Sequence, residues 1–224
     1  MNAPDTTPQG ASAVIDVDIV SDVMCPWCIV GFRQLEQALA ITGIGARVRW
    51  HPFELNPDMP PEGQNLTEHI AEKYGATAAQ SEETRAHLQK LGASLRIDFL
   101  FSPDSRIVNT FAAHQLLDFA LAHGRQHPLK LALFDAHFTQ ARDVSDHAVL
   151  LDVAEQVGLD RNAAHDVLTT GSHQDRVREQ QAFWAGHGIT GVPSIIFGGT
   201  YLTTGAQGAD TYAHVLRKVA QEAA

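Results

Sequence analysis

The sequence predicts an α/β fold in which a helical domain is inserted into a smaller domain built on a sheet. Three observations predict it: a strand–helix–strand pattern near the amino end, a long run of amphipathic helical segments in the middle, and a strand pair followed by a helix at the carboxyl end. Because the strands lie at both ends of the chain, we expect both ends to share one sheet.

The first strand, helix and second strand follow from hydrophobic periodicity. Residues 14–20 (VIDVDIV) alternate apolar with acidic side chains and are rich in β-branched types, which is typical of a strand. From Cys25 the apolar positions recur at helical spacing, and Gly43 and Gly45 supply the stop. Residues 47–53 (RVRWHPF) read as a second strand, which Pro52 ends. In one sheet, this unit should be a right-handed crossover.

Helical patterns fill residues 66–184, where apolar stripes predict about four to six helices. Ser145 is the expected N-cap of one helix, with Gly158 just past its end. Residues 193–197 (PSIIF) and 201–203 then predict a hairpin, and 210–220 a closing helix. We therefore divide the chain into a disordered tail (1–13), a sheet-containing domain (14–60 and 185–224) and a helical insertion (61–184).

Composition and charge narrow the classes of partner. Of the 224 residues, 44% are hydrophobic and 19% are charged, which is typical of a soluble globular protein. The formal charge of −10 should repel phosphate backbones and anionic lipids, so we expect neither nucleic-acid nor membrane partners. Residues 1–13 contain no Lys or Arg and no apolar run, so they do not resemble a secretory signal, and we expect a cytoplasmic protein.

The two cysteines of the chain, Cys25 and Cys28, lie three positions apart. A loop that short constrains the unfolded chain very little, so the pair is expected to be chemical rather than structural. On a helix both sulfurs would face the same side. At the helix start, free N–H groups and the helix dipole should lower the pKa of Cys25, the expected nucleophile. Cys28 falls on the apolar stripe and should be buried, less ionised and the resolving thiol.

Four further residues are expected to shape the site around the thiols. Pro26 suits the first helical turn, and Trp27 should lie at its exposed tip, where it can cover the sulfurs or meet a substrate. The Val192–Pro193 bond is a natural place for a cis peptide beside the cysteines, and the Val192 backbone could then pair with an extended substrate. The alternative is an ordinary trans proline at a strand start.

Several segments together resemble the DsbA family, and more closely its cytoplasmic FrnE-like branch. They are Ser21–Cys28 (SDVMCPWC), Phe53–Pro57 (FELNP), Asn109–His114 (NTFAAH), Gly188–Pro193 (GITGVP) and Gly205–Gln207 (GAQ). The resemblance covers nearly the whole chain from Ile15 onward. It implies a thioredoxin-like fold with an inserted helical domain, with Cys25 attacking, Cys28 resolving and Pro193 as the cis-proline.

We therefore expect a thiol-disulfide oxidoreductase that reduces or isomerises disulfides of proteins or small molecules. No bound cofactor is expected; glutathione would serve as a redox co-substrate, or the thioredoxin system as electron partner. The alternative is a glutathione-dependent isomerase or transferase of the 2-hydroxychromene-2-carboxylate isomerase or kappa glutathione transferase type, acting on a small aromatic molecule. Those relatives share the layout but usually carry a serine at the place of Cys25, so the intact pair favours redox chemistry.

Two accessory possibilities remain. Glu54, after the second strand, is a possible proton relay to Cys28, with a surface or helix-capping acid as the equal alternative. The cysteine pair could also be half of a zinc site completed by His123 and His127, although those residues lie about a hundred positions away. We expect no metal.

Overall fold

A computed structural model describes residues 14–222; the predicted disordered tail, residues 1–13, lies outside the described range. The main sheet has the strand order β2–β1–β5–β6. β1 (Val14–Ser21) runs parallel to β2 (Gly45–Pro52) and antiparallel to β5 (Ser194–Phe197), which pairs with β6 (Tyr201–Thr204). Segments from the two ends of the sequence therefore form one sheet, as predicted.

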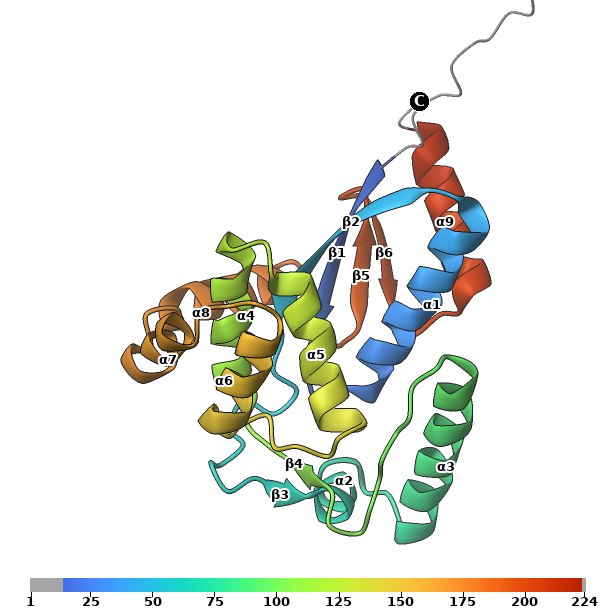
Figure 1. Cartoon of the computed structure of the whole chain (residues 1–224). Coiled ribbons are helices and arrows are strands. Elements are labelled where there is room, and N and C mark those ends of the chain that lie inside the picture. The colour runs from blue at the N-terminus through green and yellow to red at the C-terminus, as the bar shows by residue number, and fades with distance from the viewer. Residues whose placement is uncertain (1–13, 223–224) are drawn as a thin grey trace, which may run out of the picture.

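The helix α1 (Pro26–Thr42) connects the two parallel strands. Pro26 occupies its first turn, where a missing N–H removes no helical bond. Gly43 ends it with φ of 68°, a left-handed conformation that suits glycine. α9 (Ala209–Glu222) packs beside α1, and the two helices cover one face of the sheet (Figure 1). Leu35 and Leu216 are fully buried there.

The middle of the chain forms seven helices in the described residues, rather than the four to six that we expected. They are α2 (Leu66–Tyr74), α3 (Ala78–Ser94), α4 (Phe111–Ala122), α5 (Gln126–Phe138), α6 (His147–Gln156), α7 (Arg161–Thr170) and α8 (Gln174–Gly186). A short sheet of β3 (Gln64–Asn65) and β4 (Arg106–Ile107) was not predicted, because two-residue strands show no alternation. Asp146, not Ser145, caps α6, and its carboxylate accepts from Ala148 N.

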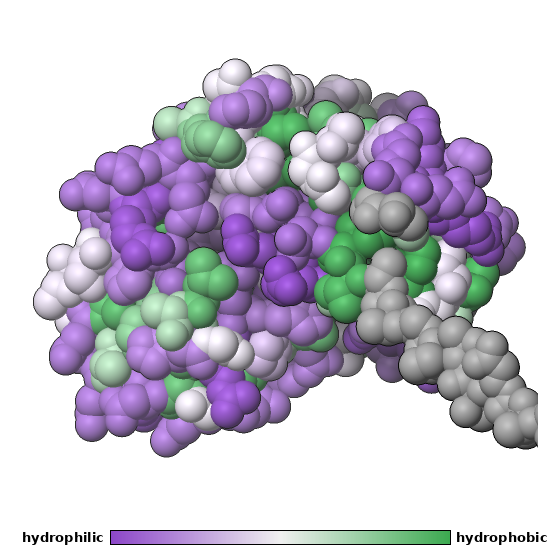
Figure 2. Space-filling view, turned by 90° about the horizontal axis from the view of Figure 1, so that it is seen from above, coloured by the Kyte–Doolittle hydropathy of each residue, from purple (hydrophilic) through white to green (hydrophobic). Residues whose placement is uncertain are grey.

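Two apolar clusters hold the helices in place. The first joins the sheet with α1, α9 and parts of α3 and α5; the second lies mainly among α4, α5, α6 and α7. α5 and α8 also contact β2, whereas α2 and α3 lie beyond the amino end of α1 (Figure 1). The end of the molecule seen in Figure 2 is mostly hydrophilic, with smaller hydrophobic patches. No helix of residues 14–222 combines the length and hydropathy that a membrane span requires.

Candidate functional site

The two cysteines lie where β1 passes into α1. Cys25 is the N-cap residue, with extended backbone angles, and its carbonyl accepts the Cys28 N–H at 3.0 Å. Both are free thiols with relative exposures of 3% and 0%. Cys28 packs with Phe32 and Leu35 in the first apolar cluster, which confirms its predicted burial. Only the sulfur at the helix start is therefore positioned to meet a substrate.

The segment before β5 lies directly against this helix start, although it is far away in sequence. The Val192–Pro193 peptide bond is cis, and Cys25 Sγ donates to the Val192 carbonyl oxygen at 3.7 Å. A Cβ built on Gly31 would lie 3.2 Å from Pro193 Cγ, so α1 approaches the proline closely at this glycine. The structure thus brings Cys25, Val192 and Pro193 together.

Helix α3 covers Trp27, which the sequence analysis expected to be exposed. Trp27 is half-buried rather than exposed, and its ring centre lies 6.2 Å from that of His87. Leu88, in the same turn of α3, is buried in the cluster that contains both cysteines. Hydrophobic periodicity could not predict the contact between α3 and Trp27, because it does not show which helices pack together when they are far apart in sequence.

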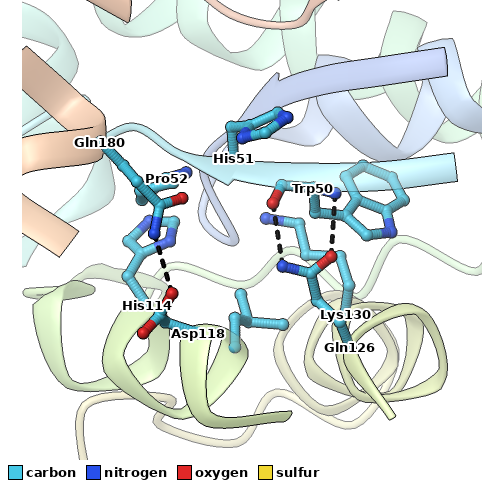
Figure 3. A pocket seen from close by; sticks show the side chains of 9 residues that line it. Trp50, His51, Pro52, His114, Asp118, Gln126, Lys130 and Gln180 are labelled. Atoms are coloured by element: carbon cyan, nitrogen blue, oxygen red, sulfur yellow. Dashed lines mark hydrogen bonds between the residues drawn. The ribbon is translucent and has the colours of Figure 1, made fainter. Parts of the chain in front are cut away.

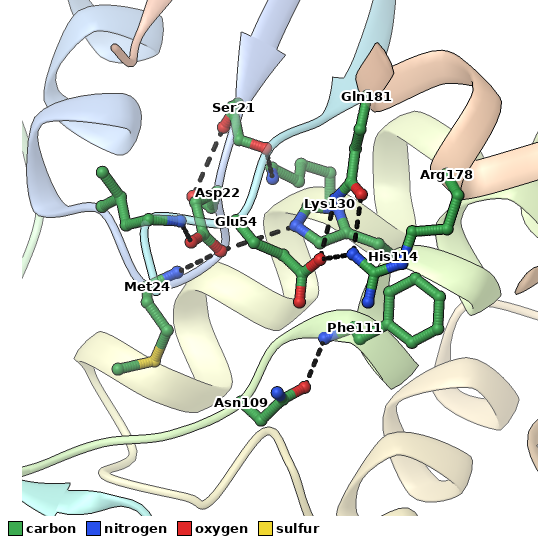
Figure 4. Close-up of polar contacts among 11 residues, drawn as sticks. Ser21, Asp22, Met24, Glu54, Asn109, Phe111, His114, Lys130, Arg178 and Gln181 are labelled. Carbon is green, nitrogen blue, oxygen red and sulfur yellow. Dashed lines mark hydrogen bonds and ion pairs between the residues drawn. The ribbon is translucent and has the colours of Figure 1, made fainter. Parts of the chain in front are cut away.

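A buried lysine that sequence analysis missed lies close to the thiols. Lys130 of α5 is 1% exposed, and its Nζ donates to the Ser21 carbonyl oxygen at 3.4 Å (Figure 4). The ammonium also lies 4.9 Å from the ring centre of Phe134 and 5.4 Å from that of Trp50. Burial lowers the pKa of Lys130 to about 8, although the charges of the cysteines and Asp22 oppose the shift.

Asp22 is the buried carboxylate of the site. Its oxygens accept from Leu55 N at 2.7 Å and from Met24 N at 3.4 Å, and His114 Nε2 lies 3.5 Å from Oδ1 (Figure 4). Burial favours the neutral acid, but the His114 imidazole, the Leu55 N–H and the Lys130 ammonium together hold the pKa of Asp22 below its usual value. Asp22 and Lys130 are therefore two buried groups of opposite charge near the cysteines.

The surroundings of the reduced pair favour a negative charge on the inner sulfur, whereas we expected it on Cys25. The hydrogen bond with Cys28, burial, and the negative charges of Cys28 and Asp22 raise the pKa of Cys25 well above its ordinary value. Burial would also raise the pKa of Cys28, but the hydrogen bond from Cys25 and the Lys130 ammonium outweigh it, so that pKa is lowered. At Cys25 the hydrogen bond with Cys28 and burial thus act against the helix terminus, and the expected ionisation order stays a prediction.

Glu54, the sequence-based candidate for a proton relay, has other partners. Its Oε2 accepts from Arg178 and, at 3.0 Å, from Gln181, both on α8, while its buried Oε1 has no partner among the described residues. The Arg178 guanidinium stacks 3.8 Å from the ring centre of Phe111. The groups that perturb Cys28 are instead Cys25, Lys130, Ser21 and Asp22. A relay through Glu54 stays a prediction.

The residues proposed for a zinc site do not gather around the thiols. His123 Nδ1 bonds to the Phe119 carbonyl oxygen at 2.9 Å, and His127 Nδ1 accepts from Trp50 Nε1 at 3.0 Å. Within residues 14–222, no three His, Cys, Asp or Glu side chains are grouped to hold a metal ion.

Two hollows reach the site. A cleft of about 690 Å³ opens over Cys25, Pro26, Trp27 and Val192 and is walled on its other side by α2, α3 and the segments around β4 and Phe138. A second cavity of only about 10 Å³, room for one water at most, touches Lys130, His114, Asp118 and Gln180 (Figure 3). Cys25 thus lines the large cleft, whereas Lys130 lines the small cavity.

Comparison with known proteins agrees with this geometry. The model of the DSBA-like thioredoxin domain family matches residues 16–217. The uncharacterized protein YwbO of Bacillus subtilis is 28% identical over 199 residues, which is 88% of this chain and 94% of YwbO. The probable DsbA oxidoreductase SCO1869 of Streptomyces coelicolor is 30% identical, with a TM-score of 0.88 over 93% of this chain and 91% of that one.

Two more distant structures share the fold. A 2-hydroxychromene-2-carboxylate isomerase is 15% identical, with a TM-score of 0.70 over 93% of this chain and 97% of that one. The cytosolic disulfide reductase DsbM of Pseudomonas aeruginosa, solved with GSH, is 15% identical, with a TM-score of 0.58 over 91% and 98% of the two chains. Since the family model spans nearly the whole sequence, the chain belongs to the DSBA-like thioredoxin domain family.

Proposed function

We propose that this protein is a thiol-disulfide oxidoreductase of the cytoplasm, in the FrnE-like branch, which reduces or isomerises disulfides through Cys25 and Cys28. The observation that carries the proposal is the asymmetric surroundings of the two thiols. Cys25 faces a substrate-sized cleft, whereas Cys28 is sealed inside near a buried lysine. A two-step dithiol reaction needs this division between an attacking and a resolving sulfur.

The mechanism starts from the shared proton of the pair. Cys25 transfers its proton to the Cys28 thiolate as its sulfur attacks the substrate disulfide, forming a mixed disulfide and releasing one substrate thiolate. Cys28 then gives its proton to the released substrate thiolate, and the neighbouring Lys130 ammonium stabilises the Cys28 thiolate that forms. The Cys28 thiolate attacks Cys25 Sγ, releases the second substrate thiolate and leaves the Cys25–Cys28 disulfide. Two electrons have passed to the substrate.

A separate reductant must restore the dithiol, because the reaction leaves both cysteines oxidised as a disulfide. Two molecules of glutathione would supply the two electrons and leave as glutathione disulfide; the thioredoxin system is the other source. The distant fold similarity to a cytosolic reductase solved with GSH supports a glutathione-coupled reaction. In this scheme the helical insertion, residues 61–184, contributes Lys130 to the chemistry and α3 to the cover.

The rival function is a glutathione-dependent isomerase or transferase that acts on a small aromatic molecule, a possibility in keeping with the fold of the isomerase relative. Such an enzyme would need Cys25 to bind glutathione but would not need a resolving thiol. The placement of Lys130 near Cys28 favours the redox function, because it equips the second sulfur to ionise.

The deciding experiment compares the wild-type protein with the Cys25→Ser and Cys28→Ser variants in glutathione-coupled disulfide reduction. We expect both variants to lose turnover, and Cys28→Ser to accumulate a mixed disulfide on Cys25 that mass spectrometry detects. Equilibration of the wild-type pair with glutathione buffers then gives its reduction potential and the direction of electron flow. Full turnover in Cys28→Ser would contradict the dithiol mechanism and support the isomerase or transferase class.

A further inference from the structure

We propose that the cleft over Cys25 selects a small thiol or disulfide with an apolar body and a carboxylate end, rather than a segment of a protein chain. This inference rests on the proposed function and specifies its substrate. Its three supports are the enclosure of the dithiol by α3, the apolar lining of the cleft, and a buried hydroxyl without a partner at the far end of α3.

The enclosure limits what can reach Cys25. α3 covers Trp27 through His87, and the attacking sulfur is only 3% exposed. α3 therefore covers part of the surface across which a protein segment would have to lie. The remaining approach is the cleft of about 690 Å³, a volume within the range of roughly 300 to 1,000 Å³ typical of small-molecule sites.

The lining of the cleft is mainly apolar and includes side chains that the fold itself leaves uncovered. Tyr74 and Leu100 line it and are 61% and 57% exposed, and Ile70, Phe101 and Phe138 line it as well. Exposed large apolar side chains that converge on one hollow indicate a binding surface, because their contact with water is unfavourable. The body of the ligand should therefore be apolar.

The polar end of the site lies on α3. Ser81 is 5% exposed, lines the cleft, and its Oγ has no hydrogen-bond partner among the described residues. A buried hydroxyl without a partner is unfavourable unless a ligand supplies one. Arg85, one turn further along the same face, also lines the cleft; its guanidinium contacts Thr67 Oγ1 at 3.0 Å and Glu82 at 2.7 Å.

Charge and length complete the description of the ligand. Although the whole chain carries −10, the cleft is lined by three arginines, Arg85, Arg106 and Arg142, against two aspartates, Asp104 and Asp143. Arg85 is paired with Glu82 and Arg142 with Asp152, whereas Arg106 has no carboxylate partner among the described residues and donates to the Glu62 carbonyl oxygen. The Arg106 guanidinium therefore favours an anionic end of the ligand. The ring of His87 lies 6.2 Å from that of Trp27, two residues after Cys25, and Ser81 precedes His87 by six residues, about 9 Å along the helix. The sulfur and the carboxylate of the ligand should be separated by a chain of similar length.

The reaction is the balanced exchange described above, with the ligand as the disulfide. One RSSR and the Cys25–Cys28 dithiol give two RSH and the protein disulfide, and two molecules of glutathione then reduce the protein disulfide. Each cycle thus transfers two electrons from glutathione to the ligand.

The first test is a substrate series in the glutathione-coupled assay. It comprises the symmetrical disulfides of mercapto-octanoate, mercapto-octanol and mercaptopropionate, together with insulin. Each kcat/KM is divided by the uncatalysed rate constant of that disulfide with glutathione, which removes differences in intrinsic reactivity. We expect this ratio for mercapto-octanoate disulfide to be at least a hundredfold higher than for insulin. It should be about tenfold higher than for the disulfides of mercapto-octanol and mercaptopropionate. Insulin turned over as efficiently as the long carboxylate would overturn the proposal.

The second test uses variants of the lining, with Leu202→Ser, an exposed residue of β6 that does not line the cleft, as the matched control for Leu100→Ser. We expect Ser81→Ala and Leu100→Ser each to raise the KM for mercapto-octanoate disulfide by about five- to tenfold while kcat is retained. Ser81→Ala should leave the thermal midpoint unchanged or higher, because it removes an unpaired buried hydroxyl.

The outcomes separate the two proposals. Unchanged KM in both lining variants would reject the cleft as the substrate site, even if every disulfide is reduced. If the wild-type protein reduced none of the four disulfides, the proposed function itself would fail. A Ser81→Ala variant that lost stability instead of affinity would show that the hydroxyl is structural, which also contradicts the inference.

Discussion

Replacing Lys130 with methionine should make the protein more stable and less active. The side chain is 1% exposed and burial lowers its pKa from 10.5 to about 8, which is a shift of about 2.5 units. At 1.36 kcal/mol per pKa unit, burial of the ammonium costs about 3 kcal/mol relative to water. Methionine has a similar shape and no charge, so Lys130→Met should raise the free energy of unfolding at pH 7 by up to about 3 kcal/mol.

The pH dependence provides an independent check on the sign. The folded-state pKa of Lys130 lies below its unfolded value, so the unfolded chain binds more protons between about pH 8 and pH 10.5. Below pH 8 the whole penalty is present, and it disappears as the pH rises through this window. The contribution of Lys130 to wild-type stability should therefore increase from about pH 8 to pH 10.5, and Lys130→Met should lack that increase.

The activity of the same variant should fall because Cys28 loses its neighbouring positive charge. A nearby opposite charge typically shifts a pKa by about 1 to 3 units, so we expect the pKa of Cys28 to rise by that amount. Each unit lowers the thiolate fraction about tenfold, but the more basic thiolate is about threefold more nucleophilic. The net loss of turnover near pH 7 should be about 3- to 30-fold, with the rate profile displaced to higher pH.

The assays are urea unfolding of the reduced protein and the pH dependence of thiolate absorbance. The control is Lys90→Met, an exposed lysine of α3, which should change neither quantity. A Lys130→Met variant with lower stability and an unaltered thiol titration would refute this reasoning, since it would show that Lys130 supports packing alone.

Three further changes test other parts of the site. Asp22→Asn should lower the pKa of Cys25, because the Asp22 carboxylate raises it, and the rate of iodoacetamide alkylation measures this effect. The same variant should lose less stability below pH 4, because the lowered pKa of Asp22 means that its contribution to stability disappears in acid; acid unfolding measures this effect. His137→Gln should reduce the loss of stability between about pH 6.5 and pH 4. Burial lowers the pKa of His137 to about 4, so only the unfolded chain takes up a proton in this range. Urea unfolding at several pH values measures the effect, and an unchanged slope of stability against pH would contradict it. Leu116→Ala, at a fully buried position between the helices, should lower the free energy of unfolding by about 2 to 5 kcal/mol, and a loss under 1 kcal/mol would show that this cluster repacks freely.

Local patterns in the sequence were sufficient for most of the fold. Alternation over residues 14–20, the glycine after α1 and the hairpin around Gly198 each reflect interactions between near neighbours in the chain, so they predicted the elements to within a few residues. The same reasoning placed Cys25 at a helix start and Cys28 on its buried face. It failed for the two-residue strands β3 and β4, which are too short to carry a pattern.

The sequence by itself therefore determined the order of the elements, the position of the dithiol and the neighbouring Val192–Pro193 segment. Only the tertiary structure decided which charged groups and which cleft-lining residues surround the sulfurs. Lys130 reads as one polar residue in a helical segment, and Ser81 as an ordinary position of α3, until packing buries both. The physical reason is that electrostatic fields and clefts arise between elements distant in sequence, and folding alone sets those distances.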